Sequence, residues 1–137
     1  MHTQYFVTAR TQLAGYHRWP EAPHPFEYLR ERHRHLFTMA VRMSVSHGDR
    51  DIEVNQLEQH MLTNWQLLAN RGQWPGEWEF DGVSCEHMAV YMATNLLNRY
   101  PTAGWVQVEV LEDGINGGGV RIERPYPNPS SGSDDSN

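Results

Sequence analysis

Apolar residues occupy alternate positions in two long segments of the N-terminal third of the chain. In YFVTARTQLA (5–14) the odd positions are mostly apolar, and in RHRHLFTMAVRMSVS (32–46) they include Phe37, Met39, Val41 and Met43. Side chains two residues apart share one face of a strand. The pattern therefore predicts two consecutive strands, the first continuing toward His17, and each with one buried face.

Two later segments have helical periodicity. Val54, Leu57, Met61, Trp65 and Leu68 follow one another at intervals of three or four, which predicts an amphipathic helix within residues 53–69. A second helix is expected over CEHMAVYMATNLLNRY (85–100). Its N-cap is Ser84, its first turn carries Glu86, which suits the helix dipole, and Pro101 ends it.

Apolar and polar residues alternate again in two segments near the C-terminus. WVQVEVL (105–111) predicts a third strand whose inward row ends at Glu112, and VRIER (120–124) a short fourth strand. NRGQWPGEWEFDG (70–82) is expected to be an irregular loop, and EDGINGGG (112–119) a turn. The order ββααββ predicts an α+β fold, an antiparallel sheet with two helices on one face. We expect one domain over residues 1–124 and a disordered tail over 125–137, which is rich in Pro, Ser, Gly and Asp.

Composition narrows the class of protein. The chain has 137 residues, 11 basic and 17 acidic, and a net charge of −6, which argues against a protein that follows a nucleic-acid backbone. It contains no run of about 18 apolar residues that predicts a membrane span. Its single cysteine, Cys85, excludes an internal disulfide, so we expect a cytoplasmic protein.

Three histidines form the candidate chemical site. His33 and His35 share one face of the second strand, about 7 Å apart along it. If the first two strands pair antiparallel, His17 at the end of the first lies near them. Zinc takes imidazole nitrogen, and its catalytic sites use three protein ligands. Isolated surface or core histidines are the alternative, and the pattern alone leaves both open.

These features resemble the 6-pyruvoyltetrahydropterin synthase and 6-carboxytetrahydropterin synthase family, which has the tunnelling fold. A lone His follows the first strand, and HRH (33–35) stands where HGH is usual. DIEVNQLEQHM (51–61) is similar to the family's DFxxLK stretch, VSCEHMAVYM (83–92) to its PTxEN segment, and VQVEVLED (106–113) to its strand with a ring-binding Glu. The resemblance covers roughly residues 5–123, and the chain is identified as a divergent member.

The resemblance implies a zinc site and a ligand site. It implies that His17, His33 and His35 hold Zn²⁺ and that Glu112 binds the N–H/NH₂ edge of a pterin or purine-like ring. Ser84 and Glu86, in the PTxEN-like segment, join this ligand site. It also implies a homo-oligomer, a hexamer with ligand pockets between subunits, since free sheet edges seek partners.

The chain departs from the family at the residues that move protons. Leu29 stands where the usual lyase has a catalytic Cys, and the DHxxLN motif is missing. Glu31 and Asp81 are the remaining candidates for proton transfer. Cys85 lies in the first turn of a helix, where the dipole lowers a thiol pKa, although a small buried residue is the simpler interpretation. Five arginines are candidate phosphate contacts if the protein binds a nucleotide, and a solvated charge set is the alternative: Arg10, Arg18, Arg30, Arg32 and Arg34.

Three functions are compatible with this pattern. The first is a zinc-dependent lyase or synthase that acts on a pterin or 7-deazapurine precursor. The second is a catalytically inactive module that binds or sequesters a purine-type nucleotide or a pterin. The third is a structural protein with the same fold and neither metal nor ligand. Intact metal ligands favour the first function, whereas the missing Asp/His pair favours the second.

Overall fold

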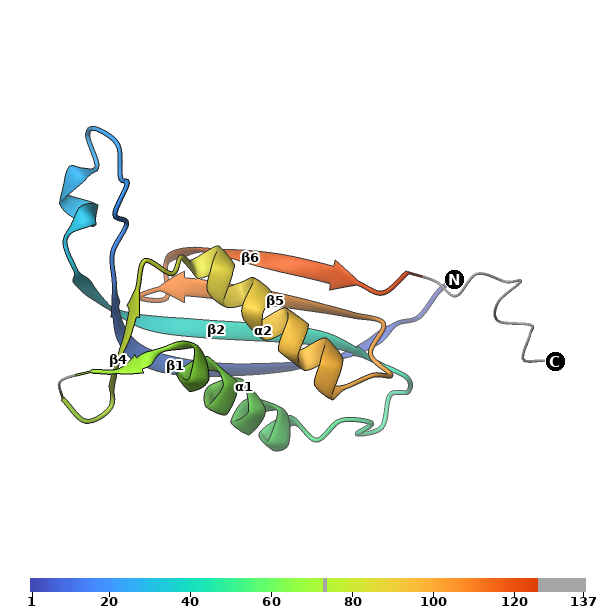
Figure 1. Ribbon diagram of the computed structural model, residues 1–137. Helices are drawn as coiled ribbons and strands as arrows, with labels where there is room; N and C mark the ends of the chain where they lie inside the picture. Colours follow the sequence, from blue (N-terminus) through green and yellow to red (C-terminus); the bar gives the residue numbers. More distant parts are fainter. Residues whose placement is uncertain (73, 126–137) are drawn as a thin grey trace.

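Six strands form one sheet, and two α-helices lie across the same face of it (Figure 1). The structure is a computed structural model that describes residues 1–72 and 74–125. Its elements are β1 (Tyr5–His17), a 3₁₀ helix (Glu27–Arg30), β2 (His33–Val45), α1 (Val54–Leu68), β3 (Asn70–Arg71), β4 (Glu77–Asp81), α2 (Cys85–Arg99), β5 (Trp105–Glu112) and β6 (Asn116–Glu123). The strand order in the sheet is β3-β4-β1-β2-β5-β6. This is the predicted α+β architecture with two short strands added.

The four expected strands pair antiparallel, as predicted. β1 and β2 pair along their whole length, from Tyr5 opposite Val45 to His17 opposite His33. The segment 70–82, expected to be a loop, contains β3 and β4. β4 pairs in parallel with β1, so the complete sheet is mixed. Phe80 of β4 is buried, and the glycine at position 15 leaves room for its ring, because a Cβ there would lie 2.8 Å from Phe80 Cε2.

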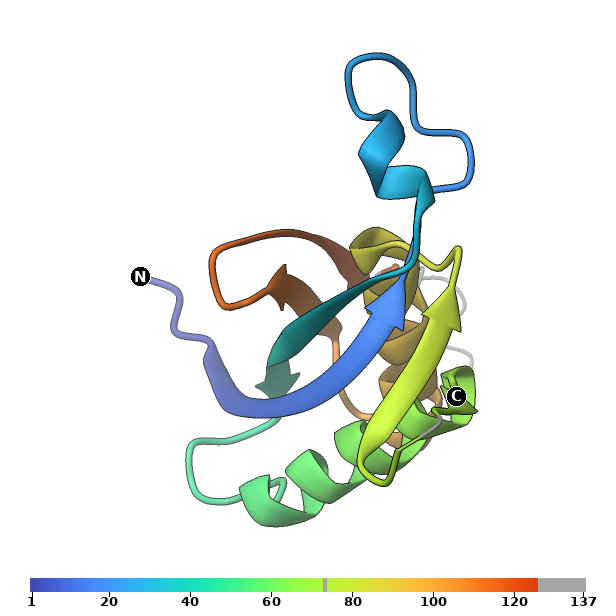
Figure 2. The same ribbon diagram turned by 90° about the vertical axis from the view of Figure 1, so that its left-hand side faces the viewer.

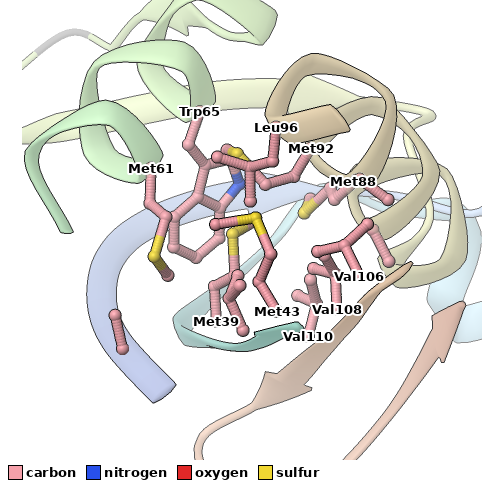
Figure 3. Packing of buried hydrophobic residues seen from close by; sticks show 14 of the residues in the cluster. Met39, Met43, Met61, Trp65, Met88, Met92, Leu96, Val106, Val108 and Val110 are labelled. Carbon is pink, nitrogen blue, oxygen red and sulfur yellow. The ribbon is translucent and has the colours of Figure 1, made fainter. Parts of the chain in front are cut away.

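The core lies between the helices and the inner face of the sheet (Figure 3). The predicted row on β2 is correct, since Phe37, Met39, Val41 and Met43 are all fully buried. Trp65 of α1 packs over the same strand, and Met88, Met92 and Leu96 of α2 reach toward Val106, Val108 and Val110 of β5. Full burial of one such side chain contributes about 1.5–3 kcal/mol, so this row fixes which face of β2 points inward.

Capping side chains set where both helices begin. Glu53 accepts hydrogen bonds from the backbone N–H groups of Asn55 and Gln56 and starts α1. Ser84 accepts one from the N–H of His87 and starts α2, as predicted. The position of Ser84 matters for the site described below, because the cap places the first turn of α2 beside the ends of β1 and β5.

Strand β6 begins earlier than expected, within the glycine-rich segment that was predicted to be a turn. Gly117 pairs with Leu111 of β5, and a Cβ at position 117 would lie 1.7 Å from the carbonyl oxygen of Val110. A Cβ at Gly118 would lie 2.7 Å from Cγ of Glu86. Positions 117 and 118 therefore require glycine, because neighbouring atoms leave no room for a Cβ. Since glycines have no side chains, this segment lacks the alternation of apolar and polar residues that predicts a strand.

The connection from β1 to β2 stands away from the rest of the molecule (Figures 1 and 2). It contains the 3₁₀ helix and the exposed side chains of Trp19, Phe26 and Tyr28. Among the described residues, no helix is long and apolar enough to cross a membrane. The predicted disordered tail lies, from residue 126 onward, outside the described residues.

Candidate metal centre and adjoining cavity

The antiparallel pairing of β1 and β2 brings three imidazoles together. His17 lies directly opposite His33, and His35 lies opposite Gly15 on the same face. The ring centroids are 4.6 Å apart for His17–His33, 5.3 Å for His17–His35 and 5.0 Å for His33–His35. One nitrogen from each ring lies within 4.8 Å of the others. The predicted proximity agrees with this geometry, and metal binding by the cluster stays a prediction.

Hydrogen bonds at Nδ1 orient all three rings. The partners are the carbonyl oxygen of Val83 for His17 at 3.1 Å, the carbonyl oxygen of Glu31 for His33 at 2.9 Å, and Oδ2 of Asp113 for His35 at 2.7 Å. Carbonyls only accept, and so does an ionised carboxylate, so each Nδ1 carries the proton and donates it. With the proton on Nδ1, Nε2 is the nitrogen that each ring in its neutral form would offer to a metal. This is the outer-shell arrangement found around metal-binding histidines.

The surroundings of His17 favour a neutral ring. Burial lowers the pKa of His17, and the nearby His33 and His35 lower it further, although the Val83 carbonyl and Glu112 oppose this effect. Only 8% of His17 is exposed, and its ring packs against that of Phe37 with 5.1 Å between the ring centroids. Metal ions bind the deprotonated nitrogen, so the lowered pKa suits His17 for binding a metal near neutral pH. The donor set and its orientation therefore fit Zn²⁺.

Glu112, at the end of β5, reaches the cluster from the neighbouring strand. Its Oε2 lies 3.0 Å from His17 Nε2, and its Oε1 lies 3.7 Å from His35 Nε2. The Cys85 thiol donates to Oε2 at 3.8 Å. Burial, together with Glu112 and Glu86, raises the pKa of Cys85 to about 12. The suggested lowering by the helix dipole is therefore wrong, because desolvation of the buried sulfur outweighs it, and the thiol stays protonated.

A cavity of about 440 Å³ opens beside the histidines. Two of the three clustered histidines, the carboxylate at the end of β5 and the first turn of α2 all border it. The lining residues are His17, Arg18, Trp19, Leu29, His33, Gly82, Val83, Ser84, Cys85, Glu86, Glu112, Asn116 and Gly117. The predicted ligand-binding residues Ser84, Glu86 and Glu112 thus surround one space, large enough for a small-molecule ligand. Their binding roles stay predictions.

In the described parts of the chain, the two predicted proton carriers, Glu31 and Asp81, do not line this cavity. Glu31 is exposed and contributes its backbone carbonyl to His33. The side chain of Asp81 is 76% exposed and accepts a hydrogen bond from Arg18 Nε at 2.8 Å. The structure therefore does not place either carboxylate beside the cavity, and a role in proton transfer stays a prediction.

Most of the candidate phosphate-binding arginines already have other partners. Arg32 pairs with Glu79 and stacks at 3.5 Å on the Tyr16 ring, and Arg34 pairs with Glu77. These five side chains lie on the face of the sheet opposite the histidines, because residues 32 and 34 have the other parity. Arg30 donates to the carbonyl of Ala22. Of the five arginines, Arg18 is the one that lines the cavity.

Asp113 also contacts the histidine cluster, although no sequence motif predicts this role. It follows Glu112 with φ 56°, and its carboxylate accepts from His35 Nδ1 and from the backbone N–H of Leu36. The bond from His35, and then that from Leu36, lowers the pKa of Asp113. The only signal in the sequence is a second acidic residue after a strand end, and its partner 78 residues away becomes visible only in the fold.

Replacing Asp113 with asparagine is expected to weaken zinc binding by about 10- to 100-fold, the usual cost of losing an outer-shell partner. The amide cannot supply the negative charge that polarises the His35 ring. The affinity is measured by competition with a chromophoric chelator. Asp49→Asn, on an exposed carboxylate paired with Arg50, is the matched control and should bind like wild type. Equal affinities for both variants would contradict the role given to Asp113.

The sheet order and the two helices on one face are those of the tunnelling fold. The sequence itself matches no protein-family model and no curated protein.

Solved structures supply the particular likeness. A 6-pyruvoyltetrahydropterin synthase from Plasmodium vivax, in a variant with cysteine replacing a catalytic glutamate, matches with a TM-score of 0.64 and 11% identity over 90% of this chain and 100% of that one. Another structure of the same enzyme gives 0.61 and 10%, with the same coverage. An uncharacterised protein from Wolinella succinogenes gives 0.57 and 11%, again with the same coverage. At such identities the likeness establishes the fold, which confirms the fold predicted from the sequence.

Proposed function

We propose that this protein is a zinc-dependent lyase or synthase of the tunnelling fold, acting on a pterin or 7-deazapurine precursor. The observation that carries the proposal is the convergence of one nitrogen from each of three imidazoles beside a cavity that Glu112, Ser84 and Glu86 also border. His17, His33 and His35 would hold the ion. Bound zinc polarises a hydroxyl or carbonyl oxygen of the substrate. The named activity of the Plasmodium vivax structures supports this substrate class.

The cavity supplies the recognition chemistry. A carboxylate at its edge can accept two parallel hydrogen bonds from the N–H/NH₂ edge of a pterin or guanine-like ring. Ser84 and Glu86, at the start of α2, add a hydroxyl and a second carboxylate. We further propose Glu31 or Asp81 as the proton carrier, which requires the exposed carboxylate to turn toward bound substrate.

A binding module without turnover is the second candidate. Two features favour it. Asp81 accepts a hydrogen bond from Arg18, and Leu29, which lines the cavity, stands where the family that the sequence resembles usually has a catalytic cysteine. In this function the same metal and the same carboxylates hold a pterin or purine-type nucleotide without converting it.

One experiment separates the candidates. Zinc-loaded protein is incubated with dihydroneopterin triphosphate, and the mixture is analysed by mass spectrometry before and after the protein is denatured. A product of lower mass that accumulates beyond one equivalent supports the lyase. Unchanged compound released in stoichiometric amount supports the binding module. Neither zinc nor compound on the protein would overturn both and leave the structural protein with this fold.

Assembly and location belong to the same proposal. Within the described residues, β3 and β6 are the edge strands of the sheet. The backbone N–H and C=O groups of an uncovered edge can pair with a strand of another subunit. We propose a homo-oligomer, a hexamer, in which sheets join edge to edge, and a cytoplasmic location, supported by a single cysteine that is buried and free. Light scattering that shows only a monomer would contradict the assembly.

A further inference from the structure

The connection between β1 and β2 (residues 18–32) gives the cavity an apolar wall. Trp19 and Leu29 both line the cavity from this segment, and Trp19 is 47% exposed. Phe26 and Tyr28 are exposed on the same connection, but they are not among the described residues that line the cavity. The carboxylates of the cavity come from other elements, α2 and β5. A large indole thus borders a space whose polar groups lie elsewhere on its lining.

Hydrogen bonds within the connection fix the backbone that carries the indole. The N–H of Trp19 donates to the carbonyl of Leu29 at 2.7 Å, and the carbonyl of Trp19 accepts from the N–H of Ala22 at 3.1 Å. Arg30 Nε donates to the carbonyl of Ala22 at 2.8 Å, and Ala22 is fully buried although the connection protrudes. The indole is therefore attached to an ordered segment before any ligand binds, which reduces the entropic cost of binding.

Trp19 also differs from other aromatic residues that are partly exposed. The guanidinium of Arg32 stacks on the Tyr16 ring at 3.5 Å, and that of Arg121 stacks on the Trp105 ring at 3.9 Å. Among the described residues, no aromatic ring or guanidinium stacks on Trp19 in this way. An indole without a stacked partner at the wall of a cavity is suited to cover the face of a flat ring.

We propose that Trp19 is a specificity-determining residue whose indole stacks on the flat ring of the ligand. The proposal rests on the proposed function, since it takes the cavity and the ring class from it. Hydrogen bonds along one edge leave a ring free to tilt, and contact with its face removes that freedom. Stacking accepts any flat heterocycle, because each has a π face. Trp19 therefore selects flat heterocycles as a class, and the carboxylates select among them by the ring edge.

Neopterin, a fluorescent pterin, tests this inference, because an indole in contact with its ring quenches its emission. The zinc-loaded full chain is titrated as wild type, Trp19→Leu, Trp19→Phe and Phe26→Leu, and equilibrium dialysis gives the affinity. We expect Trp19→Leu to bind at least about fivefold more weakly and to leave bound neopterin fluorescent. Trp19→Phe keeps an aromatic face and should retain most of the affinity. Phe26→Leu is the matched control, since Phe26 is 44% exposed on the same connection, and should behave like wild type.

Several results would overturn the inference and leave the proposed function intact. They are wild-type affinity and quenching in Trp19→Leu, an equal loss of affinity in Phe26→Leu, and a wild type that binds zinc but not neopterin. If Trp19→Leu does not fold in a thermal unfolding measurement, the wild type alone decides, because bound neopterin that keeps its emission is not stacked on an indole. Absence of both zinc and neopterin from the wild type would instead overturn the proposed function itself.

Discussion

Substitution of His33 by alanine is expected to lower zinc affinity by a factor of roughly 100 or more. His33 contributes one of three converging nitrogens, and loss of a direct ligand should exceed the 10- to 100-fold cost of losing an outer-shell partner. The ring is only partly buried, so its removal leaves the core row beginning at Phe37 in place. Chelator competition gives the affinity.

A second readout of the same variant is thermal stability. Zinc at 100 times its dissociation constant stabilises the folded wild type by about 2.7 kcal/mol, and this increment should disappear at the same zinc concentration in His33→Ala. His2→Ala, an exposed histidine before β1, is the control and should respond to zinc like wild type. Retention of the full zinc response by His33→Ala would remove His33 from the metal site.

Replacement of Gly117 by alanine is expected to destabilise the fold by about 3 kcal/mol or more. The new Cβ would stand 1.7 Å from the Val110 carbonyl oxygen and 2.8 Å from Leu111 Cα, and both are backbone atoms of β5. A side chain can rotate away from such a clash, but a paired strand can only separate. Urea unfolding gives the free energy, and the zinc affinity should fall with it because Glu112 and Asp113 lie in the same hairpin.

Gly104→Ala is the matched control for this change. A Cβ at position 104 would meet only the Ser44 hydroxyl, at 3.4 Å, and should alter the free energy of unfolding by less than about 0.5 kcal/mol. If both alanine variants were equally stable, close approach would not explain why β6 carries glycine.

The parts of the fold that the sequence predicts are those in which one periodicity persists over many residues. The row from Phe37 to Met43 identifies β2 and its inner face, and Ser84 marks the start of α2. The proximity of His17 to His33 follows from a single assumption, that consecutive strands pair antiparallel. That assumption holds across all of β1 and β2.

The features that the sequence did not reveal depend on contacts between distant segments. β4 has only Trp78 and Phe80 as inward residues, too few to show alternation, and its parallel partner β1 lies about 60 residues earlier in the chain. Asp113 gains its role only when the β5–β6 turn reaches His35. The pKa of Cys85 is governed by burial, which a position in the first turn of a helix does not disclose.

The alternation of arginine and histidine in residues 32–35 has a consequence for folding fidelity. Slipping β2 by one residue would turn both guanidinium groups inward, toward the helix-covered face, and would send both imidazoles and Phe37 to the outer face of the sheet. Burying two unpaired cations costs far more than any misaligned hydrogen-bonding pattern could return. The ion pairs of Arg32 with Glu79 and of Arg34 with Glu77 form only in the correct register. Contacts on the outer face of the sheet therefore help to select the register that brings the histidines together on the inner face.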